Sequence, residues 1–211
     1  MTTLVMLHDT RQLPEVWRNI ADYVPVQWGV VAPELHDCES IEAMVEMIER
    51  DLAPLDVVDP LLFVAVGAGV IPAVAYCAAH PGKVKAIMLS GPKLAVTRGD
   101  VRGEKLHAAL HRSARESLVR AKSADAVRFL EALAGEDMYD QLLELVRGGL
   151  GLWLVAGDKD KDGTREAERL HAALPDVTYF PIRGAEADWN EYASGVFTAN
   201  IMEFVEGLGE K

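Results

Sequence analysis

The sequence is poor in cysteine, in basic charge and in long apolar runs. Two cysteines, Cys38 and Cys77, make a disulfide framework improbable and favour a reducing, cytoplasmic location. No apolar run approaches the ~20 residues that cross a bilayer, and no basic region precedes the first apolar stretch, so we expect neither membrane association nor a cleaved signal peptide. Lys and Arg total 21 against 33 Asp and Glu, and the net charge of −12 argues against a nucleic-acid partner.

What the sequence does contain is typical of one globular domain. It has 211 residues, of which 50% are hydrophobic and 26% are charged. Short apolar runs without polar alternation are interspersed with amphipathic stretches, which predicts α/β architecture, because strands buried on both faces belong to parallel sheets covered by helices. The expected strands are 3–7, 26–31, 61–66, 85–89, 152–156 and 177–182; the expected helices are 14–23, 41–52, 69–80, 164–173 and 191–208. We therefore predict a three-layer sandwich with a mostly or wholly parallel sheet of about six strands.

One segment interrupts this alternation. Residues 93–149 follow the fourth expected strand, contain about three helical stretches and are much longer than a crossover requires. An insertion at this point lies over the carboxyl edge of the sheet, where α/β proteins bind their ligands. We predict a core formed by residues 1–92 and 150–211, with 93–149 as a helical lid.

Six segments in the right order resemble the α/β-hydrolase fold superfamily, and the resemblance covers nearly the whole chain. The central one, Phe63–Gly69, is similar to the strand–turn–helix of the nucleophile elbow in that family. The others are Leu4–His8 with Trp17, Ala32–Leu35, His80–Pro81, Leu89–Pro92 and Val155–Asp160. The first two strands of the family are missing. The resemblance implies a sheet of six strands with a pocket above its carboxyl edge.

The resemblance also implies a degenerate catalytic triad. The nucleophile of the Gly-x-Ser-x-Gly elbow corresponds to Gly67, and the histidine position corresponds to Ala187. Only the acid is retained, as Asp160. Glycine offers no nucleophile and alanine cannot accept a proton, so ordinary serine hydrolysis is excluded on this alignment.

The oxyanion hole departs from the family pattern as well. Its donors by position are the backbone amides of Thr10 and Ala68, but Asp9 stands where the family usually has glycine. A carboxylate beside this hole opposes a developing oxyanion. Pocket candidates carried over by position are His8, Asp9, Thr10, Gly67, Ala68 and Asp188.

Two other motifs are better explained by structure than by ligands. Gly67 and Gly69 lack a third glycine at dinucleotide-binding spacing. The loop Asp158–Asp162 copies the first half of a calcium loop, but its twelfth position is Arg169, and Asp162 is expected to cap the next helix. We predict no metal and no cofactor.

Three functions remain open. The favoured one is a pseudoenzyme that binds a small apolar or carbonyl-containing molecule under the lid. The second is a non-hydrolytic acid–base enzyme (isomerase, cyclase, decarboxylase or lyase), and the third is a hydrolase with a displaced triad. A homo-oligomer or a protein partner is compatible with each of them, and the fold alone cannot choose among them.

Overall fold

A computed structural model describes residues 2–55, 60–110 and 121–208 of the chain. The sheet comprises β1 (Thr3–Leu7), β2 (Gly29–Val31), β3 (Leu61–Val66), β4 (Val84–Ser90), β5 (Gly151–Gly157) and β6 (Thr178–Ile182). Its six strands run parallel in the order β2-β1-β3-β4-β5-β6. Every residue of β1 and β3 is buried, as expected for strands covered on both faces. The predicted three-layer α/β architecture is therefore confirmed.

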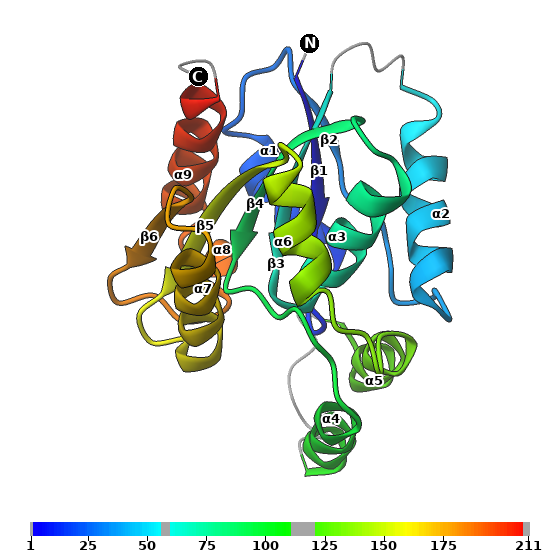
Figure 1. Ribbon diagram of the computed structural model, residues 1–211. Coiled ribbons are helices and arrows are strands. Elements are labelled where there is room, and N and C mark those ends of the chain that lie inside the picture. Colours follow the sequence, from blue (N-terminus) through cyan, green and yellow to red (C-terminus); the bar gives the residue numbers. More distant parts are fainter. Residues whose placement is uncertain (1, 56–59, 111–120, 209–211) are drawn as a thin grey trace.

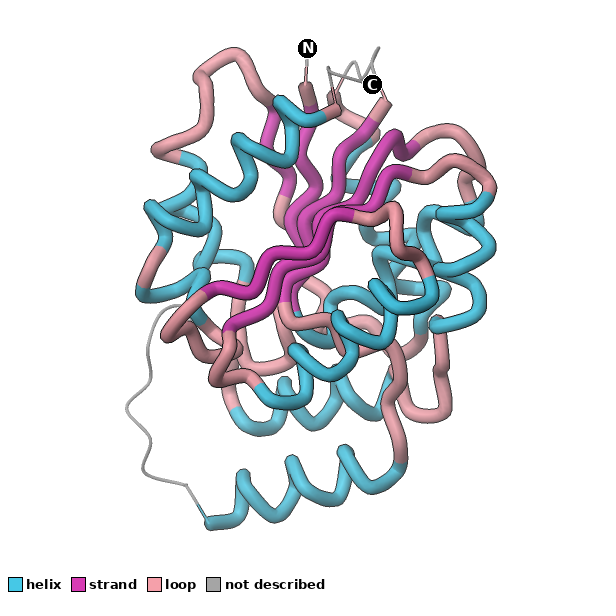
Figure 2. Tube along the Cα trace, turned by 60° about the vertical axis from the view of Figure 1, so that its left-hand side comes forward, coloured by secondary structure: helices cyan, strands magenta, loops and turns pink. Residues whose placement is uncertain are grey.

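Helices cover both faces of the twisted sheet (Figures 1 and 2). One apolar core lies between the sheet and α2 (Ile41–Leu52), α3 (Val70–Ala79), α6 (Tyr139–Arg147) and α7 (Lys161–Ala173). The second core lies under the short helices η1 (Pro14–Trp17) and α1 (Arg18–Ala21), together with α8 (Trp189–Tyr192) and α9 (Ser194–Gly207). None of the helices in the described ranges is long and apolar enough to span a bilayer. Both cysteines are buried and free.

Most elements lie within a few residues of their predicted bounds, and two differ for local reasons. The strand expected at 26–31 begins only at Gly29, because the amide of Trp28 donates to the carbonyl of Pro25 in a turn (2.8 Å) that leaves Val26 fully exposed. Ser40 caps α2 by accepting a hydrogen bond from the amide of Ala43. The cap of α7, however, is Asp160 rather than Asp162.

The segment predicted as a lid divides into two parts. Figure 1 shows α4 (Arg98–Leu110) and α5 (Ser123–Ala132) beyond the carboxyl ends of the strands, as a lid requires, with residues 111–120 between them outside the described part. Further along the chain, α6 packs beside α3 and serves as the crossover helix between β4 and β5. Phe129 of α5 and Leu142 of α6 belong to the same apolar core, so the division of the chain into a core and a lid at 93–149 stays a prediction.

Candidate functional site at the carboxyl ends of the strands

The turn from β3 into α3 retains the geometry of an elbow. Gly67 has φ +56°, and in the described ranges every residue with positive φ is a glycine. The left-handed conformation costs other L-residues about 1–2 kcal/mol, so glycine suits this position. Two residues later the chain passes so close to the end of β1 that a Cβ added at Gly69 would lie 2.5 Å from the carbonyl oxygen of His8. The elbow is thus tightly packed against the loop that follows β1.

The carboxylate of Asp9 fills the space above the elbow. Its Oδ1 accepts a hydrogen bond from the amide of Ala68 at 2.8 Å and one from the hydroxyl of Thr10 at 3.4 Å. A Cβ added at Gly67 would lie 2.1 Å from the same oxygen. Asp9 therefore occupies both the position of a nucleophilic side chain and the amide expected to serve as an oxyanion-hole donor.

A buried polar cluster holds the loop that carries Asp9. The amide of Asp9 donates to Oε1 of Gln12, at 3.3 Å. The Gln12 amide group in turn donates to Oδ1 of Asn190 and Oε1 of Glu191, both at 3.0 Å. This cluster could not be predicted from the sequence, because Gln12 lies 178 and 179 positions from Asn190 and Glu191 and the three residues match no motif.

Asp160 lies on the opposite side of the elbow, at the end of β5. Its Oδ1 accepts from the amide of Gly163 at 3.0 Å, and its Oδ2 would lie 2.6 Å from a Cβ added at Gly91. Burial raises the pKa of Asp160, and the negative charges of Asp162 and Asp9 raise it further, against the hydrogen bond from Gly163. Ionisation of Asp160 is therefore disfavoured in the folded protein.

A cavity of about 350 Å³ joins these groups. Its lining includes Asp9, Gly67, Asp160 and Ala187, so the positions assigned to nucleophile, acid and histidine face one hollow. Leu94, Ala95 and Asp100 add a wall from the segment after β4. A larger hollow of about 870 Å³ lies between α2, α3 and α6, but no residue of the elbow lines it, so we place the candidate site at the smaller cavity.

The lining of this cavity is charged. Lys93 pairs with Asp100, Arg165 with Asp162 at 2.6 Å and Arg169 with Glu166 at 3.1 Å. In contrast, Asp9 and Asp160 have no basic partner among the described residues. The three basic side chains that line the cavity are thus each paired with a carboxylate, whereas Asp9 and Asp160 beside the elbow are not part of such a pair in the described structure.

The Lys93–Asp100 pair carries a stability prediction. Burial opposes ionisation of Asp100, but hydrogen bonds from Lys93 and Thr97 outweigh it and lower the pKa from 3.8 to about 2. The contribution of ionised Asp100 to the free energy of unfolding is therefore complete above pH 3.8 and disappears as the pH falls toward 2. We expect Asp100→Asn to reduce the free energy of unfolding by about 1 kcal/mol at pH 7, after discounting for partial exposure.

Urea unfolding of the wild type and Asp100→Asn at pH 7 and pH 3 measures this difference, which should shrink at the lower pH. Asp162→Asn is the matched control, because the Asp162 side chain is 87% exposed in its pair with Arg165. Its cost should stay below about 0.5 kcal/mol. A cost for Asp100→Asn that is equal at both pH values would contradict the assignment.

The remaining candidates lie outside this cavity. Asp188 precedes α8 and is not among the residues lining the hollow. The ring of His8 is fully buried and turns away toward β2. In the acidic loop, Asp158 accepts from the amide of Gly184 at 2.8 Å and α7 already begins at Lys161, so the loop does not have the course of a calcium loop.

A displaced nucleophile–base pair finds no support among His8, His36, His80 and His171. Their ring nitrogens bond to backbone carbonyls or approach Glu34 and Glu49, with no serine, threonine or cysteine side chain as partner in the described ranges. The buried hydroxyl of Ser90, at the end of β4, accepts a hydrogen bond from the indole of Trp189 at 3.0 Å. Burial raises the pKa of Cys77 to about 12, which leaves an inert thiol.

Comparison with known structures identifies the fold. A carboxylesterase of the thaumarchaeon Nitrososphaera gargenis superposes with a TM-score of 0.76 at 16% identity, over 99% of this chain and 91% of the other. MenH from S. aureus gives 0.78 at 12% identity, over 99% and 94% of the two chains. MGS-M2, an α/β hydrolase from a deep-sea metagenome, gives 0.77 at 13%, over 97% and 89%.

This protein has the α/β-hydrolase fold. Identities of 12–16% establish the architecture alone, because one scaffold supports many functions. No protein-family model matches the sequence, and no curated protein does. The function is therefore argued from the site.

Proposed function

We propose that this α/β-hydrolase-like protein is a pseudoenzyme that binds a small molecule at the elbow without forming an acyl intermediate. The observation that carries the proposal is the Asp9 carboxylate, which fills the place of a nucleophile and accepts the amide of Ala68. An oxyanion developing there would meet a fixed negative charge instead of a hydrogen-bond donor.

The same observation favours a particular ligand chemistry. A ligand carbonyl would face carboxylate oxygens, whereas an ammonium or another strong hydrogen-bond donor would complement Asp9 and Asp160 together. Both carboxylates lack a basic partner in the described structure and line a hollow of about 350 Å³. We therefore assign the site to a small cationic or donor-rich ligand, in place of the apolar or carbonyl-containing molecule that the sequence favours.

A matched set of probes tests the ligand class. We expect n-butylammonium to bind more tightly than butyramide, and butyrate not to bind, in titrations followed by NMR at low salt. Asp160→Asn should weaken butylammonium binding about tenfold, which is about 1.4 kcal/mol. Its melting temperature should equal or exceed that of the wild type, because asparagine still caps α7 and no longer carries the disfavoured charge.

Asp162→Asn is the control for general charge effects, since this carboxylate already pairs with Arg165. An equal loss of binding in both variants would reveal non-specific attraction. Tighter binding of butyrate than of butylammonium would overturn the ligand class. A wild-type protein that hydrolyses p-nitrophenyl butyrate, or reacts with a fluorophosphonate, would overturn the proposal itself.

One observation favours a second candidate, acid–base catalysis without a nucleophile. The raised pKa of Asp160, caused first by burial, suits a group that exchanges protons inside a cavity. In that case Asp160→Asn would leave ligand affinity nearly intact and reduce turnover on the order of 10²–10⁴-fold. A binding protein shows the opposite pattern, with affinity lost and no turnover to lose.

A further inference from the structure

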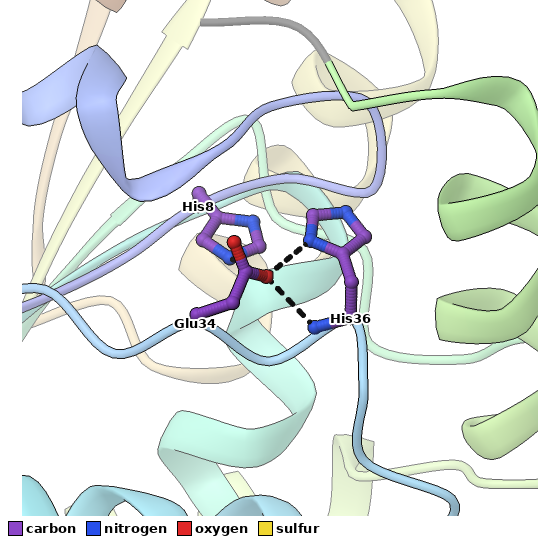
Figure 3. Close-up of side chains that lie close together, drawn as sticks. All are labelled: His8, Glu34 and His36. Atoms are coloured by element: carbon purple, nitrogen blue, oxygen red, sulfur yellow. Dashed lines mark hydrogen bonds and ion pairs between the residues drawn. The ribbon is translucent and has the colours of Figure 1, made fainter.

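A second cluster of chemically competent side chains lies beside the elbow loop. His8 follows β1, and Glu34 and His36 follow β2, so the carboxyl ends of two neighbouring parallel strands bring them together (Figure 3). His36 Nδ1 lies 2.6 Å from Glu34 Oε1, and His8 Nε2 lies 3.8 Å from the same oxygen. One ligand atom from each residue lies within 4.8 Å of the other two.

In each ring, the nitrogen that is farther from Glu34 forms a hydrogen bond with a backbone carbonyl. His8 Nδ1 is 3.0 Å from the carbonyl oxygen of Asp9, and His36 Nε2 is 2.9 Å from that of Thr10. Because a carbonyl only accepts, both of these nitrogens donate their protons to it. In neutral rings the lone pairs are then on His8 Nε2 and His36 Nδ1, the two nitrogens nearest Glu34. Metal-binding histidines are oriented in the same way.

His8 Nε2 is a buried polar atom without a hydrogen bond in the described structure. The residue has no exposed surface, and this nitrogen has no hydrogen-bond partner. Because Nδ1 donates to the carbonyl of Asp9, the lone pair of the neutral ring lies on this unpartnered nitrogen. A buried polar atom without a partner carries a free-energy cost that a ligand can remove.

We propose that His8 Nε2, Glu34 Oε1 and His36 Nδ1 bind a divalent transition-metal ion of the zinc class. Two imidazoles and one carboxylate, with an open fourth position, form an established tetrahedral donor set. In such a site the ligand atoms are roughly 3.3 Å apart. The present separations of 2.6 and 3.8 Å to Glu34 bracket that value. The ion would replace the proton that His36 and Glu34 now share.

The surroundings fit an ion that enters from solvent. The side chain of Glu34 is 42% exposed, which allows the carboxylate to move and leaves a route to the open position. The ring of Phe129, from α5, packs against both imidazoles, with centroid separations of 5.8 Å to His8 and 5.2 Å to His36. The imidazole planes are 7° apart, so binding requires one ring to tilt.

This site is separate from the cavity at the elbow. None of its three residues lines that cavity, although His8 directly precedes Asp9. Metal binding can therefore be tested without knowing the ligand of the elbow, and failure of one proposal leaves the other standing.

The test uses the whole, untagged chain after treatment with a chelator. Isothermal titration with Zn²⁺ should give one ion per chain with a Kd of about 1 μM or lower, and elemental analysis should confirm the ratio. Co²⁺ at the same site should give the strong visible absorption of tetrahedral coordination. Glu34→Gln and His36→Gln should each weaken Zn²⁺ binding at least about 100-fold, since removing a ligand costs more than removing a group that orients one.

His171→Gln is the matched control, because that ring also bonds to a backbone carbonyl but lies in the last turn of α7, far along the chain. It should bind Zn²⁺ like the wild type. Glu34→Gln keeps the test valid if a histidine variant does not fold, because Glu34 is half-exposed. A wild-type Kd above about 100 μM, or equal affinities in Glu34→Gln and His171→Gln, would overturn the site.

Discussion

Gly67→Ala should destabilise the protein by about 2.5–4 kcal/mol, and most of this cost should disappear when Asp9 is also replaced. Two penalties combine at Gly67. The left-handed backbone costs alanine about 1 kcal/mol. The new Cβ would also lie 2.1 Å from Asp9 Oδ1 and displace a carboxylate that accepts the amide of Ala68. Losing a buried, charge-assisted hydrogen bond costs about 1.5–3 kcal/mol.

Guanidinium unfolding of the wild type, the single variants Gly67→Ala and Asp9→Gly and the double variant measures the coupling. In the Asp9→Gly background, Gly67→Ala should cost only about 1 kcal/mol, so the coupling energy is about 2 kcal/mol. Gly184→Ala is the control for backbone strain, because φ there is +76° and a Cβ would meet nothing within 4 Å. Equal costs of Gly67→Ala in both backgrounds would show that Asp9 does not occupy this space.

Reactivity toward a fluorophosphonate should appear when three substitutions are combined. Asp9→Gly frees the amide of Ala68, Gly67→Ser supplies a nucleophile and Ala187→His supplies a base. The retained Asp160 lines the same cavity as these positions and can orient the imidazole. The wild type and each single variant should remain unlabelled, because the three groups act as a unit.

Labelling followed by mass spectrometry of the modified peptide measures this gain. Adding Asp160→Asn to the triple variant should slow labelling on the order of 10²–10⁴-fold. A folded triple variant that stays unlabelled would contradict the assignment of residues to the triad positions. Labelling outside the elbow peptide would contradict it as well.

The fold could be predicted from the sequence because its signals are local. Continuous apolar runs such as 61–66 mark strands buried on both faces, and the spacing of Ile41, Met44 and Ile48 marks one helix face. The prediction of the second strand was wrong in part, because the turn at Pro25 removes half of it.

The candidate site could be predicted only in part. The resemblance to the elbow assigns the nucleophile and histidine positions to Gly67 and Ala187, and the structure brings both residues to one cavity. The position of the Asp9 carboxylate could not be predicted from the sequence, because it depends on backbone distances between β1 and β3. Similarly, nothing in the sequence around His36 indicates a partner for it. Its partner His8 is 28 positions away and is close only because β1 and β2 are adjacent.

The position of the Asp9 carboxylate also sets the order in which substitutions could introduce hydrolase chemistry into this fold. A serine codon arising first at position 67 must expel a carboxylate already bonded to Ala68, so this intermediate is penalised before it gains any activity. Replacing Asp9 first would free the space above Gly67 and the amide of Ala68, but this substitution alone supplies no nucleophile and therefore no hydrolase activity. One side chain, rather than the scaffold as a whole, therefore makes the first single substitution toward a hydrolase unfavourable in this protein.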